Sequence, residues 1–143
     1  AGIQTAIELQ KKNIFEVILV SDRDYLYLYP ISIWIPVHIK EFEDVKIQLT
    51  DIQKKYPFKL ITDSVTEIRA SENRVICQNS TLDYDYLVVA FGSDKMQHKG
   101  MANTMSICAK PETAMDILHK IDELVLKKEG KIAIGFGGNP NEI

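Results

Sequence analysis

Two hydrophobic periodicities follow one another at the start of the chain. Residues 2–12 carry apolar side chains at helical spacing and end on two lysines, which predicts a short amphipathic helix. Residues 14–20 are β-rich and almost continuously apolar, as is typical of a strand covered on both faces in a parallel sheet. A helix followed by a buried strand is one half of a βαβ unit.

The same patterns return in the second half of the chain. Residues 84–91 predict a second buried strand, which Gly92 stops. Residues 112–128 place their apolar side chains on one helical stripe and predict a long amphipathic helix. Residues 131–136 predict a third buried strand.

Shorter patterns fill the middle of the chain. Residues 24–39 hold aromatic side chains and prolines, which predicts a packed loop. Residues 45–56 are predicted to be helical and to end at Pro57. Strand-like runs then predict a small antiparallel meander. These runs are 58–62, 64–69 and 74–78. The element order therefore predicts an α/β fold, a parallel sheet with a small antiparallel β insertion.

Composition narrows the class of protein. The 143 residues are 45% hydrophobic and 26% charged with a net charge of -3, which predicts a globular chain. The lysines are spread along the sequence, which argues against a nucleic-acid partner. The longest apolar stretch, residues 31–39, is interrupted and far shorter than the roughly 20 residues of a spanning helix, so no membrane span is predicted in this chain.

The cysteines and the two chain termini lead to expectations about the compartment of the protein and the extent of the chain. Cys77 and Cys108 belong to no CxxC or Cys/His cluster, so neither a metal site nor a disulfide scaffold is predicted. A reducing, cytoplasmic compartment is the corresponding expectation. The chain begins on Ala1 with no leader pattern, and few residues follow the last strand-like run. We therefore expect a piece of a longer protein.

One glycine and one acid stand at dinucleotide-binding spacing. Such a βαβ unit needs glycines where strand turns into helix, because side chains there would keep the backbone from the pyrophosphate. Gly2 fits the third of these glycines, although a helix that merely begins with Ala-Gly is the plain alternative. Asp22 follows 20 residues later, where an acid binds the ribose. Ser21 is the alternative ribose ligand, depending on where the strand ends.

Four segments, taken in order and spacing, resemble a known group of flavoproteins. They are residues 1–9, 19–25, 82–92 and 132–138. They resemble the FAD-binding half of the two-dinucleotide-domain flavoproteins, specifically the sulfide:quinone oxidoreductase and type II NADH dehydrogenase group. The resemblance spans almost the whole chain and implies a Rossmann-like FAD/NAD(P)-binding sheet. By it, residues 1–143 would be an FAD-binding domain without its first strand and most of its glycine loop, and residues 131–143 would begin a second dinucleotide-binding domain.

The resemblance also implies cofactor contacts. Arg23 falls in the matched segment that ends the ribose-binding strand. Ala90, Phe91 and Gly92 match the segment whose backbone approaches the FAD, with Phe91 where the family usually has threonine. Val65 would place its backbone against the adenine, although from the residues alone it is simply a strand valine.

Further residues near the flavin follow from the same resemblance. The loop containing Pro30 would lie near the isoalloxazine. Cys108 resembles the cysteine that some sulfide:quinone oxidoreductases place before the long helix, and is the candidate catalytic residue, with buried packing as the plainer alternative. The sulfide-oxidising members carry another redox cysteine after the next glycine-rich turn, and residues 135–143 contain none.

These observations predict an enzyme fragment. The full-length parent would be a flavin-dependent oxidoreductase that passes electrons from NAD(P)H or a sulfur species through FAD to an acceptor such as quinone. The isolated chain is predicted to bind FAD weakly or not at all and to be inactive. The resemblance allows the parent to lie peripherally on the inner membrane, and the sequence leaves open whether it forms a homo-oligomer. The alternatives are a non-catalytic Rossmann-like scaffold that has lost the cofactor and a plain NAD(P)-binding domain.

Overall fold

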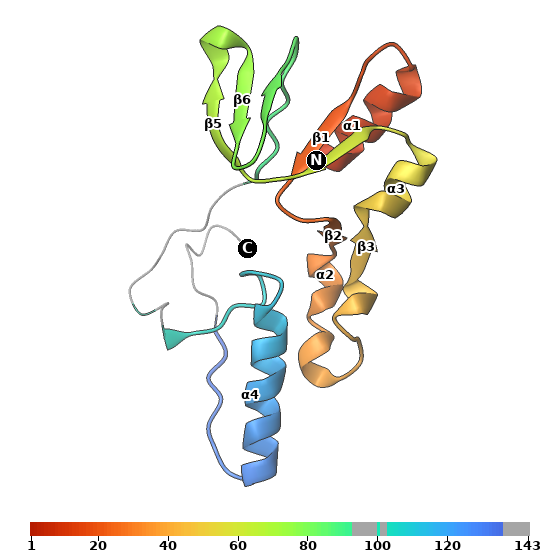
Figure 1. Cartoon of the computed structure of the whole chain (residues 1–143). Coiled ribbons are helices and arrows are strands. Elements are labelled where there is room, and N and C mark those ends of the chain that lie inside the picture. The colour runs from red at the N-terminus through yellow and green to blue at the C-terminus, as the bar shows by residue number, and fades with distance from the viewer. Residues whose placement is uncertain (93–99, 101–102, 136–143) are drawn as a thin grey trace. The chain divides into compact units, whose positions relative to one another are not determined.

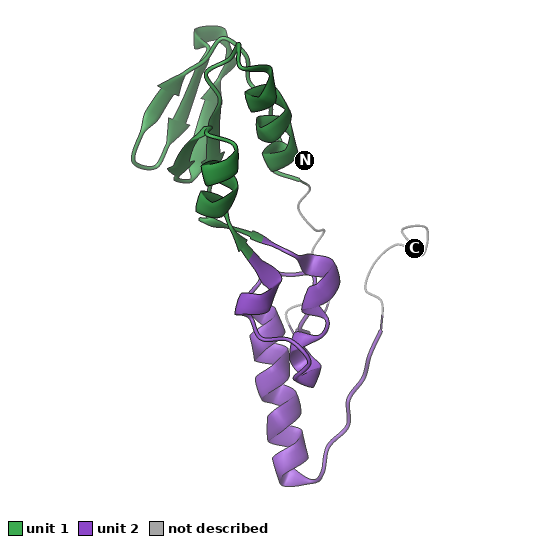
Figure 2. Cartoon of the chain, turned by 90° about the vertical axis from the view of Figure 1, so that its right-hand side faces the viewer, with its two compact units in different colours: residues 1–26, 47–93 green, residues 27–46, 94–143 purple. Residues whose placement is uncertain are grey.

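The computed structural model describes residues 1–92, 100 and 103–135. The chain divides into two compact units, coloured in Figure 2. The first consists of Ala1–Leu26 with Ile47–Ser93, and the second of Tyr27–Lys46 with Asp94–Ile143. Helices, a parallel strand pair and antiparallel strands are all present, so the predicted α/β fold class is confirmed.

A helix-covered parallel strand pair forms the core of the first unit (Figure 1). Helix α1 covers Gly2–Lys12, the range predicted from the sequence, and it ends where Asn13 turns left-handed at φ 53°. Strand β1, Ile18–Ser21, pairs in parallel with β4, Lys59–Thr62. Ala6, Val17 and Phe58 are buried between these elements and short helix α3, Leu49–Lys55. Partly buried apolar side chains surround them, namely Ile7, Leu9, Leu19, Ile52, Tyr56 and Leu60.

The antiparallel insertion is a three-stranded sheet. Its strands are β5 (Val65–Arg69), β6 (Arg74–Cys77) and β7 (Thr81–Asp83), in the order β5-β6-β7. The 3-10 turn Ala70–Glu72 joins the first two, and Asn73 closes it at φ 51°. Two of the three predicted runs, 64–69 and 74–78, therefore form strands of this sheet, and its third strand, β7, was not predicted. The run at 58–62 joins the parallel pair instead, because Phe58 and Leu60 pack on the core below α1.

Residues 24–48 form short elements. The predicted packed loop contains β2 (Tyr25–Tyr27), α2 (Tyr29–Ser32) and the 3-10 turn η1 (Ile35–Val37). Pro30 and Pro36 stand in the first turns of α2 and η1, where proline's missing N–H costs nothing.

The helix predicted over residues 45–56 forms only in its second half. A 3-10 turn, Glu43–Val45, and strand β3, Lys46–Gln48, precede α3. Leu28 N–H donates to the carbonyl of Val45 at 2.9 Å, and Leu49 N–H donates to the backbone carbonyl of Asp24 at 2.8 Å. These pairings with the segment before α2 replace the first predicted helical turns, so tertiary contacts override local propensity.

Two predicted buried strands are wrong within the described residues. Residues 84–91 form no strand, and Val88 and Phe91 are 58% and 69% exposed. Residues 131–135 form none either, and Ile134 is 95% exposed. A strand exists only through a ladder of hydrogen bonds to a neighbour. Tyr84 N–H donates to the Asn73 carbonyl at 2.9 Å, but neither run belongs to a sheet in the structure's described part. Residue 136 lies outside that part.

Helix α4, Thr113–Lys127, forms the core of the second unit with η1. Its start and end agree with the predicted helix at 112–128. The fully buried side chains of this unit come from several elements, namely Ser32, Ile35, Val45 and Ala114. His38 Nε2 and Asp122 Oδ1 lie 2.8 Å apart and join the end of η1 to α4. No described helix has the length and hydrophobicity needed to span a membrane.

Candidate functional site

The start of α1 lies directly against the segment that holds Ala90. A Cβ added to Gly2 would lie 3.1 Å from the Cβ of Ala90, closer than side chains normally pack. With any larger residue at position 2, Ala90 would therefore have to move by a few tenths of an ångström. The structure thus brings together two of the predicted cofactor-binding residues, and a glycine is what permits their close approach.

The electrostatics of α1 favour an anion at its N-terminus. Its first turn carries no acidic side chain, and Lys11 and Lys12 occupy the last turn. Unpaired backbone N–H groups and the helix dipole give the start of a helix positive character. This end of α1 is therefore suited to a phosphate group.

The end of β1 presents the two candidate ribose ligands. The strand ends at Ser21, so Asp22 is the first residue beyond it. The Arg23 backbone N–H donates to Ser21 Oγ at 3.4 Å, and Arg23 Nε lies 3.4 Å from Asp22 Oδ1. The Asp22 side chain is 62% exposed. Ser21 is thus held in its own turn, whereas the Asp22 carboxylate faces solvent with Arg23 beside it.

A buried carboxylate that sequence reasoning missed lies next to this strand end. Asp63 is only 8% exposed and directly follows β4. Its oxygens accept hydrogen bonds from the Ser64 and Asn79 backbone N–H groups at 2.8 and 3.0 Å. They also accept from Asn79 Nδ2 at 3.1 Å and from Ser80 Oγ at 2.9 Å.

These hydrogen bonds decide the ionisation of Asp63. Burial by itself raises the pKa of the carboxyl, but the bonds from Ser80, Asn79 and Ser64 outweigh it and leave the pKa below its ordinary value. Asp63 is therefore an ionised, fully occupied acceptor at neutral pH. A polar residue immediately after an apolar strand was the signal in the sequence, but its partners stand 16 and 17 positions away.

Val65 and the 90–92 segment are placed in the same unit. Val65 begins β5 opposite Cys77, next to an irregularity in the pairing between Val65 and Glu67. Gly92 has φ 78° with open space around it, a conformation that favours glycine. Phe91 is exposed. All predicted cofactor-binding residues thus lie in the first unit.

Cys108, the candidate catalytic residue, lies in the second unit and is exposed. Its backbone N–H donates to Ser106 Oγ at 3.3 Å. The segment after it is held by two tyrosines: Tyr29 Oη donates to the Ala109 carbonyl at 3.2 Å, and Tyr27 Oη to the Pro111 carbonyl at 3.3 Å. Burial raises the pKa of the Tyr27 phenol, so it stays a neutral donor near pH 7.

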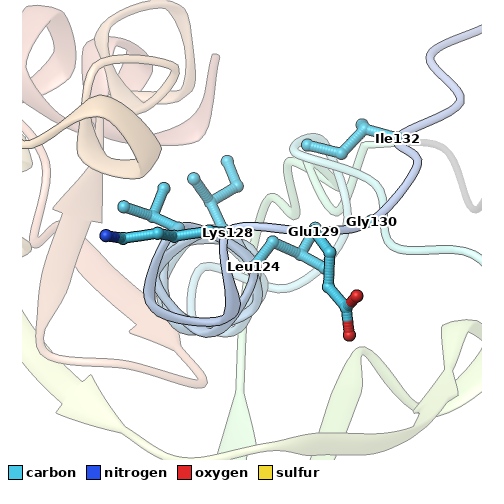
Figure 3. Close-up of a pocket in the computed structure, with 7 residues that line it drawn as sticks. Leu124, Lys128, Glu129, Gly130 and Ile132 are labelled. Atoms are coloured by element: carbon cyan, nitrogen blue, oxygen red, sulfur yellow. The ribbon is translucent and has the colours of Figure 1, made fainter.

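One open cavity of about 300 Å³ lies at the C-terminal end of α4 (Figure 3). Its walls come from the last turns of the helix and the segment after it, namely Ile121, Leu124, Val125, Lys128, Glu129, Gly130 and Ile132. None of the predicted site residues lines it. Gly137 and Gly138, in the segment 131–143 that is predicted to begin a second dinucleotide-binding domain, lie outside the described residues.

The parallel pair, the glycine-permitted contact at α1 and the antiparallel insertion together define a Rossmann-like α/β fold. No family model matches the chain. In sequence it is 29% identical over 144 residues to a sulfide-quinone reductase of Aquifex aeolicus (strain VF5), across 94% of this chain and 32% of that protein. The predicted resemblance to the sulfide:quinone oxidoreductase group is thereby confirmed.

Solved structures agree with the sequence relative. The X-ray structure of the sulfide:quinone oxidoreductase from Aquifex aeolicus matches with a TM-score of 0.67 and 25% identity, over 88% of this chain and 31% of that one. NDH2 from Plasmodium falciparum, solved in complex with NADH, matches with a TM-score of 0.66 and 18% identity, over 85% and 27%. The second likeness shows the fold alone. The chain spans about a third of the length of its curated relative.

Proposed function

We propose that this chain is the FAD-binding portion of a flavin-dependent oxidoreductase. The observation that carries the proposal is the close approach of Gly2 to Ala90 at a helix start free of acidic side chains. Similarity to a protein named sulfide-quinone reductase supports it. The whole protein would pass electrons from a reduced donor, NAD(P)H or a sulfur species, to an acceptor such as quinone.

The residues of the first unit fit the parts of a dinucleotide. The backbone at the start of α1, beside Gly2, would face the pyrophosphate. Ser21 or Asp22, with Arg23 next to them, would bind the ribose, and the Val65 backbone would meet the adenine. Backbone atoms of a further segment would approach the cofactor at Ala90, Phe91 and Gly92. FAD supplies the redox chemistry when bound, and these residues bind and orient it.

Cys108 would supply the thiol for a sulfur donor. It is exposed, as a thiol that meets a substrate must be. Tyr27 and Tyr29 hold the segment that follows it and so limit its conformations. Reduction by NAD(P)H would not need the thiol, so the role of Cys108 distinguishes the two donor classes.

The proposal extends to the parts of the protein around this chain. Residues 131–143 would open a second dinucleotide-binding domain. The whole protein would lie in the cytoplasm, peripheral to the inner membrane, where a quinone acceptor is reached.

A non-catalytic scaffold is the second candidate function. Phe91 stands exposed where the family usually has threonine, and Ser21 is already hydrogen-bonded within its own turn. Both features suit a chain that keeps the fold and has lost the cofactor.

Flavin absorbance of the full natural protein tests the proposal. We expect visible flavin bands after purification. Gly2→Val should weaken FAD binding at least about tenfold, because the new side chain meets Ala90. Ala70→Val, at an exposed turn of the same unit, is the matched control and should leave binding unchanged. A colourless, folded protein that ignores added FAD would contradict the proposal and favour the scaffold.

A further inference from the structure

Asp63 is a buried carboxylate to which neither the sequence motifs nor the family resemblance gives a role. We propose that Asp63 is a positioning residue that sets the spacing between the end of β1 and the backbone of Val65. These are the two places where the proposed function, on which this inference rests, puts the adenosine half of the cofactor. Asp63 itself would touch neither ribose nor adenine.

The Asp63 carboxylate joins two loops of the first unit. Its bonds from Ser64 fix the turn that leads into β5, and its bonds from Asn79 and Ser80 fix the turn between β6 and β7. Every one of these donors is uncharged. Because the side chain accepts four hydrogen bonds, it has little capacity left for a ligand, and its action is confined to holding the protein.

The backbone around Asp63 extends the same connection to the ribose end. Asp63 N–H donates to the carbonyl of Ser21 at 2.9 Å, one position beyond the last β1–β4 pair. Gln78 N–H donates to the carbonyl of Ser64 at 2.8 Å. Residue 63 therefore links the strand end that carries Ser21 to the backbone immediately before Val65.

Only an ionised carboxylate satisfies all of these donors. An asparagine at this position would offer one oxygen and turn an NH₂ group toward two of the donors. A buried donor left without an acceptor is costly, so the turns would shift to find other partners. Such a shift would move Ser64 and Val65 relative to Ser21 while α1 and its start stay in place.

The test is Asp63→Asn in the full natural protein after its bound flavin has been removed, with FAD and ADP titrated separately by calorimetry. ADP probes the adenosine half alone. We expect both dissociation constants to rise by the same factor, about tenfold. An irreversibly misfolded fraction would lower the number of binding sites and leave the dissociation constants unchanged. Reversible unfolding could raise the constants about tenfold only if about nine tenths of the protein were unfolded, which circular dichroism of the unliganded variant would reveal.

A second variant and a control complete the design. Ser80→Ala removes one of the four donors, keeps the carboxylate, and should weaken both ligands about threefold. If Asp63→Asn does not fold, the Ser80→Ala variant by itself tests the positioning role of Asp63. Asp51→Asn, an exposed carboxylate on α3 paired with Lys54, should change neither constant.

The possible outcomes separate the two proposals. Unchanged dissociation constants in folded variants would overturn the positioning role, as would weaker FAD binding with unchanged ADP binding. A folded wild-type protein that binds neither FAD nor ADP would overturn the proposed function itself, and the inference with it.

Discussion

At the scale of single residues, one glycine and one buried carboxylate determine how closely the segments of the first unit approach one another. Gly2 lets α1 approach Ala90, and Asp63 accepts four hydrogen bonds next to the end of β1. Gly2 was predicted as the glycine that opens the first helix, and Asp22 from its spacing to Gly2. The role of Asp63 was not, because its partners are distant in sequence.

The lowered pKa of Asp63 predicts how stability depends on pH. A carboxyl whose folded pKa lies below its unfolded value of about 3.9 stabilises the fold above that value and loses this contribution as pH falls through the folded pKa. Asp63→Asn should therefore lower the urea midpoint at pH 7 and at pH 5 equally. The difference from wild type should shrink below about pH 4.

Urea unfolding followed by circular dichroism measures this difference. Asp51→Asn corrects for the loss of one acidic charge at an exposed position. A difference between wild type and Asp63→Asn that persists undiminished at pH 3 would show that the carboxylate is not what stabilises the fold.

At the scale of elements, hydrogen bonds between segments distant in sequence determine where β3 forms and how the chain enters α4. β3 replaces the first turns of a predicted helix, and two tyrosines from β2 and α2 hold the chain just before α4. The carbonyl of Pro111 accepts both from Tyr27 Oη and from Ala114 N–H. The start of α4 thus depends on a residue more than eighty positions earlier in the chain.

Tyr27→Phe should loosen the start of α4. The loss of a buried hydrogen bond costs about 1 kcal/mol, so hydrogen exchange at the Ala114 and Met115 amides should accelerate roughly fivefold. Tyr29→Phe should have a smaller effect, because its ring is exposed. Equal acceleration at amides of α1 would instead indicate global destabilisation and contradict a local role.

At the scale of the whole molecule, the described residues include a run of apolar side chains that is exposed to solvent. Residues 86–91 form no strand and present exposed apolar side chains, including Val88, Val89 and Phe91. The relatives are about three times longer than this chain. The run has the composition of a strand that is buried between others.

If the chain is part of a longer protein, as proposed above, we expect residues 87–90 to pair as a strand in that full natural protein. Their amides should then exchange with solvent orders of magnitude more slowly than in the isolated chain. Hydrogen exchange on both forms measures this, with the amides of β6, already paired here, as an internal reference. Equally rapid exchange in both forms would show that the run stays outside the sheet.

The sequence by itself determined those elements whose signals are local. Helices α1 and α4 and the β5–β6 hairpin follow from side-chain periodicity and from turn residues within a few positions. The spacing of Gly2 and Asp22 and the order of the matched segments likewise predicted the class of relatives. Periodicity shows which face of an element is apolar, and this face is set by the segment's own residues.

Only the tertiary structure decided which strands form and which polar groups meet. β4 pairs with β1 rather than with the meander, and residues 84–91 form no strand. Asp63 accepts three of its four hydrogen bonds from the β6–β7 turn. Each outcome depends on a partner remote in sequence. A strand needs a neighbouring strand, and a buried charge needs hydrogen-bond donors. In both cases the partner lies in another part of the sequence, so the segment itself does not predict it.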